Sequence, residues 1–117
     1  MKATELRIGN WVIDQDGEQS QVMSILINGT HRWWNPIPLT VEWLERFGFD
    51  VYDLQNRKRA YQNNFNINLF KRGDIKISYK HRQLSIDLKY VHQLQNLYFA
   101  LTSEELQIKS DEKHPNN

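Results

Sequence analysis

Residues 90–101 read YVHQLQNLYFAL, and their spacing predicts the strongest regular element of the chain. Apolar side chains recur at steps of three and four residues, which lines them up along one face of a helix: Val91, Leu94, Leu97, Tyr98 and Leu101. The opposite face carries Gln93, Gln95 and Asn96, which are neutral amides rather than acids, bases or nucleophiles. This C-terminal helix is therefore expected to pack against a sheet and to carry no chemistry.

The composition of the 117-residue chain is that of one ordinary domain. Hydrophobic residues make up 39% and include four Trp, five Tyr and five Phe, so a core can form without covalent staples. The absence of cysteine excludes disulfides, thiolate metal sites and cysteine nucleophiles, and it fits a reducing, cytoplasmic location. Because the N-terminus is polar and the apolar runs are short, neither a signal peptide nor a membrane-spanning segment is expected.

The N-terminal third carries the signals of short antiparallel strands. Residues 6–13 alternate in part and lead into Asp16-Gly17, a pair that favours the positive φ angles of a tight hairpin. Residues 21–27 are predicted as the returning strand, and residues 30–34 as a possible third strand. These strands indicate an antiparallel β meander or a small SH3-like barrel.

Residues 35–38 read NPIP, and the two prolines are expected to interrupt regular structure before a short helix. Thr40 is a good N-cap for this helix, and Gly48 is expected to end it in the left-handed conformation. Its buried stripe is expected to consist of Trp43, Leu44 and Phe47.

The second half of the chain returns to β-structure. Strands are predicted at residues 49–52 and 66–70, and the polar, basic stretch 55–62 between them is interpreted as a loop. Residues 74–79 and 83–88 alternate cleanly and are expected to pair as a hairpin. Such alternation implies one solvated face, and the C-terminal helix is expected to cover the other.

The fold class predicted from these elements is α+β. It consists of a small antiparallel meander or SH3-like barrel, a short central helix, a second β-hairpin and a C-terminal helix packed on the sheet. One domain is expected over residues 1–108. Residues 109–117 are polar and poor in core-forming side chains, so they are expected to be a disordered tail.

Three phrases of the sequence are distinctive when they are taken in order. They are LRIGNWV at residues 6–12, PIPLT at 36–40 with EWL at 42–44 and FGF at 47–49, and VHQLQNLYFALT at 91–102. Together they resemble a family of short, uncharacterised proteins from gut-type anaerobic bacteria and their prophages or mobile elements. The resemblance implies a small cytoplasmic accessory protein linked to a phage or mobile element, and it carries over no catalytic or binding residue. Ser103 stands where the family's phrase has a helix-ending glycine.

The net charge of +1 conceals an uneven distribution along the chain. Residues 1–54 hold four basic against eight acidic side chains, residues 55–90 hold nine against two, and residues 91–117 hold two against four. A basic middle segment attracts phosphate or an acidic partner, unless it faces the acidic segments of its own fold. Aromatic residues are interleaved with it, which favours nucleic-acid binding through residues 57–82. The candidate residues are Arg57, Lys58, Arg59, Lys71, Arg72, Lys80 and Arg82.

Trp33 and Trp34 are a second candidate site, for a protein partner. Adjacent side chains of a strand point to opposite faces, so both rings cannot enter one core. An exposed Trp is a favoured anchor of protein interfaces, unless a neighbouring loop covers it. The function expected first is therefore a non-enzymatic accessory or adaptor protein that acts by protein–protein binding, with the partner and the oligomeric state left open. A nucleic-acid-binding module is the alternative.

The sequence offers no constellation for catalysis or metal binding. No two of the four histidines have the spacing that places both on one helix face, and His92 is expected at the surface of its helix. The five glycines stand apart, so no phosphate loop is present, and no serine lies in a nucleophile-elbow pattern. We therefore expect a protein that is not an enzyme and uses neither a metal nor a cofactor.

Residues 110–117 offer almost no apolar area to bury, so they are expected to contribute nothing to folding stability. A chain that ends at Lys109 should melt at the same temperature as the full chain when thermal unfolding is followed by circular dichroism. A clear fall in the melting temperature would mean that this segment docks.

Overall fold

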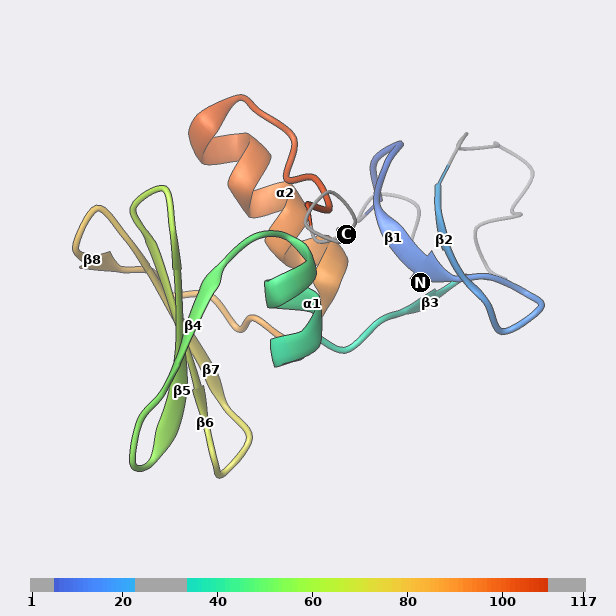
Figure 1. Ribbon diagram of the computed structural model, residues 1–117. Helices are drawn as coiled ribbons and strands as arrows, with labels where there is room; N and C mark the ends of the chain where they lie inside the picture. Colours follow the sequence, from blue (N-terminus) through green and yellow to red (C-terminus); the bar gives the residue numbers. More distant parts are fainter. Residues whose placement is uncertain (1–5, 23–33, 110–117) are drawn as a thin grey trace, which may run out of the picture. The chain divides into compact units, whose positions relative to one another are not determined.

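The computed structural model describes residues 6–22 and 34–109, which fold into two α-helices and two antiparallel sheets (Figure 1). This architecture confirms the predicted α+β class. The chain divides into two compact units. Unit 1 consists of Met1–Pro38 and Tyr90–Leu106, and unit 2 consists of Leu39–Lys89 and Gln107–Asn117. One domain over residues 1–108 stays a prediction.

The sheet of unit 1 has three short strands in the order β2-β1-β3. β1 (Trp11–Ile13) pairs antiparallel with β2 (Gln19–Gln21). The Asp14 carboxylate holds the turn between them by accepting the backbone N–H groups of Asp16 and Glu18 at 2.9 and 3.0 Å. The predicted hairpin is therefore confirmed, although its second strand begins at Gln19 rather than at residue 21.

β3 (Asn35–Pro36) pairs antiparallel with the other edge of β1. The prediction that regular structure stops at these residues is wrong. β3 is an edge strand, where a proline can stand because its missing N–H is turned away from the ladder. The strands predicted at residues 21–27 and 30–34 fall mostly on residues 23–33, which lie outside the described residues.

α2 (Val91–Thr102) is the helix predicted at the C-terminal end, and it belongs to unit 1. Its buried side chains are those of Val91, His92, Leu94, Gln95 and Tyr98. Leu97 is only half-buried and Leu101 is exposed, so the buried face is rotated away from these two leucines. His92, which we expected at the surface, is buried because of this rotation.

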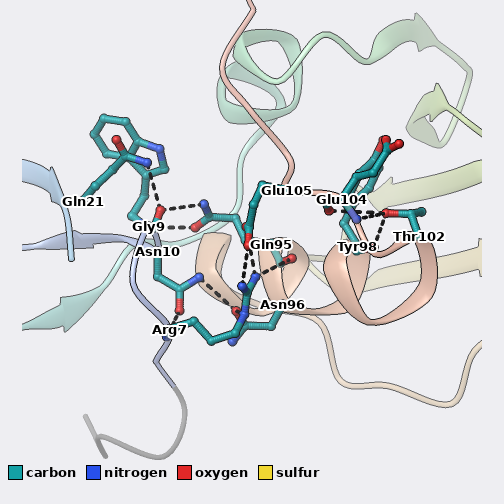
Figure 2. A network of polar contacts seen from close by, with 11 residues as sticks. Arg7, Gly9, Asn10, Gln21, Gln95, Asn96, Tyr98, Thr102, Glu104 and Glu105 are labelled. Atoms are coloured by element: carbon teal, nitrogen blue, oxygen red, sulfur yellow. Dashed lines mark hydrogen bonds and ion pairs between the residues drawn. The ribbon is translucent and has the colours of Figure 1, made fainter. Parts of the chain in front are cut away.

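Gln95 is 2% exposed and joins α2 to the segment that leads into β1 (Figure 2). Its Oε1 accepts the backbone N–H of Trp11 at 2.8 Å, and its Nε2 donates to the carbonyl of Gly9 at 3.1 Å. Gly9 has a φ of +98°, a conformation that glycine adopts without a steric penalty. One amide side chain thus satisfies both a donor and an acceptor of a neighbouring backbone.

Asn96 is the centre of a second group of polar contacts (Figure 2). Its Oδ1 accepts Nε of Arg7 at 2.8 Å and Nδ2 of Asn10 at 2.9 Å. Arg7 also donates from Nη1 to the Glu105 carboxylate at 2.7 Å, and its guanidinium carbon lies 4.5 Å from the ring centroid of Phe99. The amide face of α2, which we placed opposite the packing face, is therefore itself a packing face.

Unit 2 begins with α1 (Val41–Arg46), whose ends are those predicted. Thr40 Oγ1 accepts the backbone N–H of Trp43 at 3.3 Å, and Gly48 has a φ of +91°. Trp43, Leu44 and Phe47 are buried as predicted, and α1 packs against the first two strands of the unit 2 sheet.

That sheet is an antiparallel meander of five strands in chain order. The strands are β4 (Asp50–Asp53), β5 (Arg57–Gln62), β6 (Phe65–Phe70), β7 (Ile75–Tyr79) and β8 (Arg82–Gln83). The loop predicted over residues 55–62 is wrong, because β5 occupies most of this stretch and is paired on both sides. Pairing with two neighbours outweighs the low strand propensity of its charged residues. The strand predicted over residues 83–88 is also wrong beyond Gln83, where β8 ends.

The ladder register separates an apolar face of this sheet from a polar one. Ala60, Ile67 and Ile77 stand opposite one another on β5, β6 and β7, and all three are buried. Since successive side chains of a strand point to opposite faces, the residues on either side of these three point to the other face. That other face carries polar side chains from each of these three strands.

Lys109 is part of the ordered structure of unit 2, whereas we expected the tail to begin at this residue. Its backbone N–H donates to the carbonyl of Arg46 at 2.6 Å. Its Nζ donates to Oε1 of Gln62 on β5 at 2.9 Å. The rest of the predicted tail, residues 110–117, lies outside the described residues.

Gln95→Ala should lower the free energy of unfolding by about 1–3 kcal/mol, because it leaves the Trp11 N–H without its buried acceptor. Urea denaturation measures this loss. Gln107→Ala is the control, because Gln107 is exposed and its loss should change stability by less than about 0.5 kcal/mol. Equal stability of the two variants would contradict the role of Gln95.

Candidate functional site

One face of the unit 2 sheet is mostly polar, and we call it the open face. Strand alternation and register assign these residues to it. Each of them is exposed or half-buried. The open face consists of Asp50, Tyr52, Arg57, Arg59, Tyr61, Asn66, Asn68, Phe70, Lys76 and Ser78.

One row of the open face crosses four strands. It consists of Tyr52 on β4, Arg59 on β5, Asn68 on β6 and Lys76 on β7. Side chains opposite one another in an antiparallel sheet have Cβ atoms about 4.5–5.5 Å apart. A ring, a guanidinium, an amide and an ammonium group therefore lie within reach of one bound chain.

Arg57 and Arg59 are each held by an asparagine of β6. Nε of Arg57 donates to Oδ1 of Asn68 at 2.9 Å, and Nε of Arg59 donates to Oδ1 of Asn66 at 2.8 Å. Arg59 uses only its Nε–H in this bond. Its two Nη amino groups can therefore donate to an acceptor on a ligand. The asparagines thus fix the arginines in place without neutralising them.

Two tyrosine rings are exposed among these polar groups. Tyr52 is 55% exposed and Tyr61 is 39% exposed. Phe70 adds a half-buried ring at the end of β6, and the guanidinium carbons of Arg57 and Arg72 lie 6.0 and 5.2 Å from its centroid. The open face therefore offers flat aromatic surface beside positive charge.

Unit 2 carries an excess of positive charge. Its described residues hold eleven basic and six acidic side chains, a net charge of +5. The ion pairs among them are Lys58–Asp53, Arg72–Asp74 and Lys89–Asp87. Within this part of the chain, Arg57, Arg59 and Lys76 have no carboxylate at ion-pair distance. The cations of the open face are therefore not held in ion pairs with carboxylates of unit 2.

Arg72, in contrast, is paired with Asp74. Its Nε and Nη2 donate to the carboxylate oxygens of Asp74 at 2.6 and 3.1 Å. The hydrogen bond from Arg72 lowers the pKa of Asp74, and the same bond raises the pKa of Arg72. Both groups stay charged at neutral pH, so the pair offers little net charge to a ligand.

The sheet divides the seven basic residues predicted from the sequence. Arg57 and Arg59 lie on the open face, whereas alternation turns Lys58, between them, to the opposite face. The others lie at two turns at opposite ends of the strands, Lys71 and Arg72 after β6 and Lys80 and Arg82 around the end of β7. They do not gather with the arginines of β5 in one row.

Sequence reasoning gave no functional role to several residues of the open face, among them Tyr52, Asn66, Asn68 and Lys76. Lys76 was predicted only as a member of an alternating strand, and Tyr52, Asn66 and Asn68 only as strand residues. Asn66 and Asn68 alternate with buried Ile67, which is a readable signal of one polar face. Their contact with the arginines depends on the register of β5 against β6.

The predicted protein-binding pair is divided as well. Trp33 lies outside the described residues. Trp34 is half-buried and packs against the core cluster of unit 1, which consists of Leu6, Val12 and Val22. Trp34 therefore contributes to the packing of unit 1, and an interface at Trp33 or Trp34 stays a prediction.

Neither a metal centre nor a membrane helix is found in residues 6–22 and 34–109. No group of three or more His, Asp or Glu side chains in these ranges is placed to hold a metal ion. No helix in them is long and apolar enough to cross a membrane. Of the histidines in these ranges, His81 is exposed beside the end of β7, and His92 is buried in unit 1.

Comparison with protein-family models, with curated proteins and with solved structures finds no match to this chain. The family resemblance of the sequence phrases therefore stays a prediction. The open face is the feature from which a function can be argued.

Arg59→Ala should leave the fold intact, because it removes an exposed side chain and one hydrogen bond, which is worth about 0.5–1.5 kcal/mol. Ala60→Arg, one residue further along β5, should abolish cooperative folding, because it forces a charge into a buried row. Urea denaturation followed by tryptophan fluorescence measures both. A large loss of stability in Arg59→Ala would mean that this arginine belongs to the core of the fold.

Proposed function

We propose that this protein binds single-stranded nucleic acid through the open face of the unit 2 sheet. The observation that carries the proposal is the row of Tyr52, Arg59, Asn68 and Lys76 across four strands. The proposal develops the nucleic-acid alternative drawn from residues 57–82. It assigns the binding to one face of the sheet rather than to all the basic residues of the segment.

Each group of this row matches a feature of a nucleic-acid strand. Guanidinium and ammonium groups attract phosphates, and the Nη pair of Arg59 can donate to two phosphate oxygens. The exposed rings of Tyr52 and Tyr61 can stack on bases, an interaction worth about 1–3 kcal/mol per base. Arg57 and Arg59 stand roughly 7 Å apart along β5, which lets them follow one extended backbone.

A single strand suits this face better than a duplex. The faces of paired bases are stacked on each other, so tyrosine rings reach only bases that are unstacked. A duplex is read by a helix or a β-ribbon inserted into its major groove, whereas the open face presents side chains from a broad sheet. RNA-binding sheets with exposed aromatic residues also bind unpaired bases, although this comparison is an analogy of architecture.

The adaptor function predicted first from the sequence has less support. Trp34 is half-buried and packs against the cluster of Leu6, Val12 and Val22, which leaves only part of its surface for a partner. The open face holds arginines and amides at its centre, whereas the centre of a protein interface is depleted in charged residues. Cations without carboxylate partners favour a polyanion. The cytoplasmic location expected from the sequence gives access to nucleic acid, and a link to a phage or mobile element stays a prediction.

Fluorescence anisotropy with a short, labelled, mixed-sequence single strand tests the proposal. Arg59→Ala and Tyr52→Ala should each weaken binding by about 1–3 kcal/mol, or roughly 5- to 150-fold, because one loses a phosphate contact and the other a stacking ring. Lys58→Ala is the matched control. It removes the same charge as an arginine variant from the same strand, but on the opposite face, and should bind like the parent.

The salt dependence separates phosphate contacts from stacking. Each phosphate contact with a single strand contributes about 0.7 to the slope of log K against log salt concentration. Arg59→Ala and Lys76→Ala should therefore lower this slope, while Tyr52→Ala should leave it unchanged. A parent protein that binds no single strand at low salt, or an equal loss in Lys58→Ala and Arg59→Ala, would contradict the proposal.

A further inference from the structure

At the β8 edge of the unit 2 sheet, the chain after β8 separates from β7. A pocket lies in the gap between them, which we call the split. β8 pairs with the end of β7, and the N–H of Leu84 still donates to the carbonyl of Ile77 at 2.9 Å. β8 ends at Gln83, and the pocket, of about 370 Å³, lies between the segment that follows it and the beginning of β7. This volume falls within the range of about 300–1,000 Å³ that ligand sites occupy.

The backbone of Ile75 faces this pocket. Successive residues of an antiparallel strand direct their N–H and C=O groups alternately to the two neighbouring strands. On the β6 side, the N–H of Phe70 donates to the carbonyl of Asp74 at 3.0 Å. On the β8 side, the N–H of Leu84 donates to the carbonyl of Ile77. Ile75 therefore directs its N–H and C=O to the β8 side, where β8 has ended.

The pocket walls combine apolar and polar groups. Ile75, Leu84 and Ile86 supply apolar surface, and Lys76 and Ser85 supply hydrogen-bonding groups. A neighbouring N–H and C=O complement the donor and acceptor pair that a nucleobase presents along its edge. The two carboxylates of the lining do not repel a polyanion strongly, since each is paired with a basic residue: Asp74 with Arg72 and Asp87 with Lys89.

We propose that this pocket binds one unstacked nucleobase of the strand held on the open face, an inference that rests on the proposed function. Lys76 connects the two sites, because it belongs to the row of the open face and also lines the pocket. Its ammonium group holds a phosphate where the strand leaves the sheet. The base that follows enters the pocket, contacts the apolar walls and pairs its edge with the backbone of Ile75.

An extended peptide is the other chain that an unpaired strand edge can bind. Strand addition depends on several successive pairs of backbone hydrogen bonds. Within the described residues of β7, Tyr79 and Ile77 already have partners on the β8 side, so Ile75 is left as the one residue that faces the split. One residue offers too short a ladder for a peptide, but it offers the donor and acceptor that one base needs.

Two variants impair the pocket without changing a residue in the row of the open face. Ser85→Trp fills the pocket from an exposed position. Ile75→Pro removes the N–H that faces the pocket, and that N–H is turned away from the β6–β7 ladder. Gln107→Trp is the control, because it adds the same ring at an exposed position that does not line the pocket.

The experiment compares the affinities for single-stranded oligonucleotides of equal length that contain only adenine, only cytosine, only thymine, or abasic residues. The parent and Gln107→Trp should prefer one base over the others, and over the abasic strand, by roughly 5- to 150-fold. Ser85→Trp and Ile75→Pro should lose the preference among the bases. Both should still bind single strands through the open face, and adding Arg59→Ala should weaken that binding.

The outcomes separate the two proposals. If the parent binds single strands with equal affinity for every base, or if both pocket variants keep the preference, the pocket proposal is overturned and the open face stands. If the parent binds no strand, both proposals fail. Binding of an extended peptide that Ser85→Trp abolishes, without any base preference, would identify the other occupant and overturn the pocket proposal.

Discussion

The pairing of β5 between β4 and β6 is the constraint on which unit 2 depends. Its register places Ala60 opposite Ile67 in the buried row, and alternation then turns Arg57, Arg59 and Tyr61 to the open face. A shift of one residue would exchange the two faces, bury both arginines and expose Ala60. The charged run, which reads as a loop, therefore disfavours a shift of one residue, because that shift would take its guanidinium groups out of water.

The functional proposals follow from this register. It brings Asn66 and Asn68 beside the arginines, and a guanidinium that is already hydrogen-bonded loses less conformational freedom when it binds a phosphate. It also extends the row of Arg59 to Lys76, at the edge where β8 ends and the pocket begins. Unit 1 shows a different use of polar side chains. There the amides of Gln95 and Asn96 bind backbone and side-chain groups near the start of β1, and they serve stability rather than recognition.

Local signals in the sequence were sufficient for part of the fold. Thr40 and Gly48 mark the ends of α1, and Asp16-Gly17 marks the first hairpin, because caps and turns depend on a few neighbouring residues. The stretch 55–62 was misread because its charged residues are poor strand formers in isolation, and pairing with two neighbours decides their conformation. Gln95 was misplaced because periodicity counts apolar side chains, whereas a buried amide is found only once its backbone partners are known. The open face could not be predicted for the same reason. Its rows join residues of four strands, and these residues become neighbours only when the register of the strands is known.

Nuclear magnetic resonance of the ¹⁵N-labelled protein, titrated with a short single strand of mixed sequence, tests the central claim most directly. The Nε–H groups of Arg57 and Arg59 report on the open face, because each is hydrogen-bonded to an asparagine and can be followed as a separate resonance. We expect saturable shifts of these two resonances and of the backbone amides of Tyr52 and Lys76, with no shift at Gln95 in unit 1. Saturable shifts confined to unit 1, or a spectrum that the oligonucleotide leaves unchanged at low salt, would contradict binding by the open face.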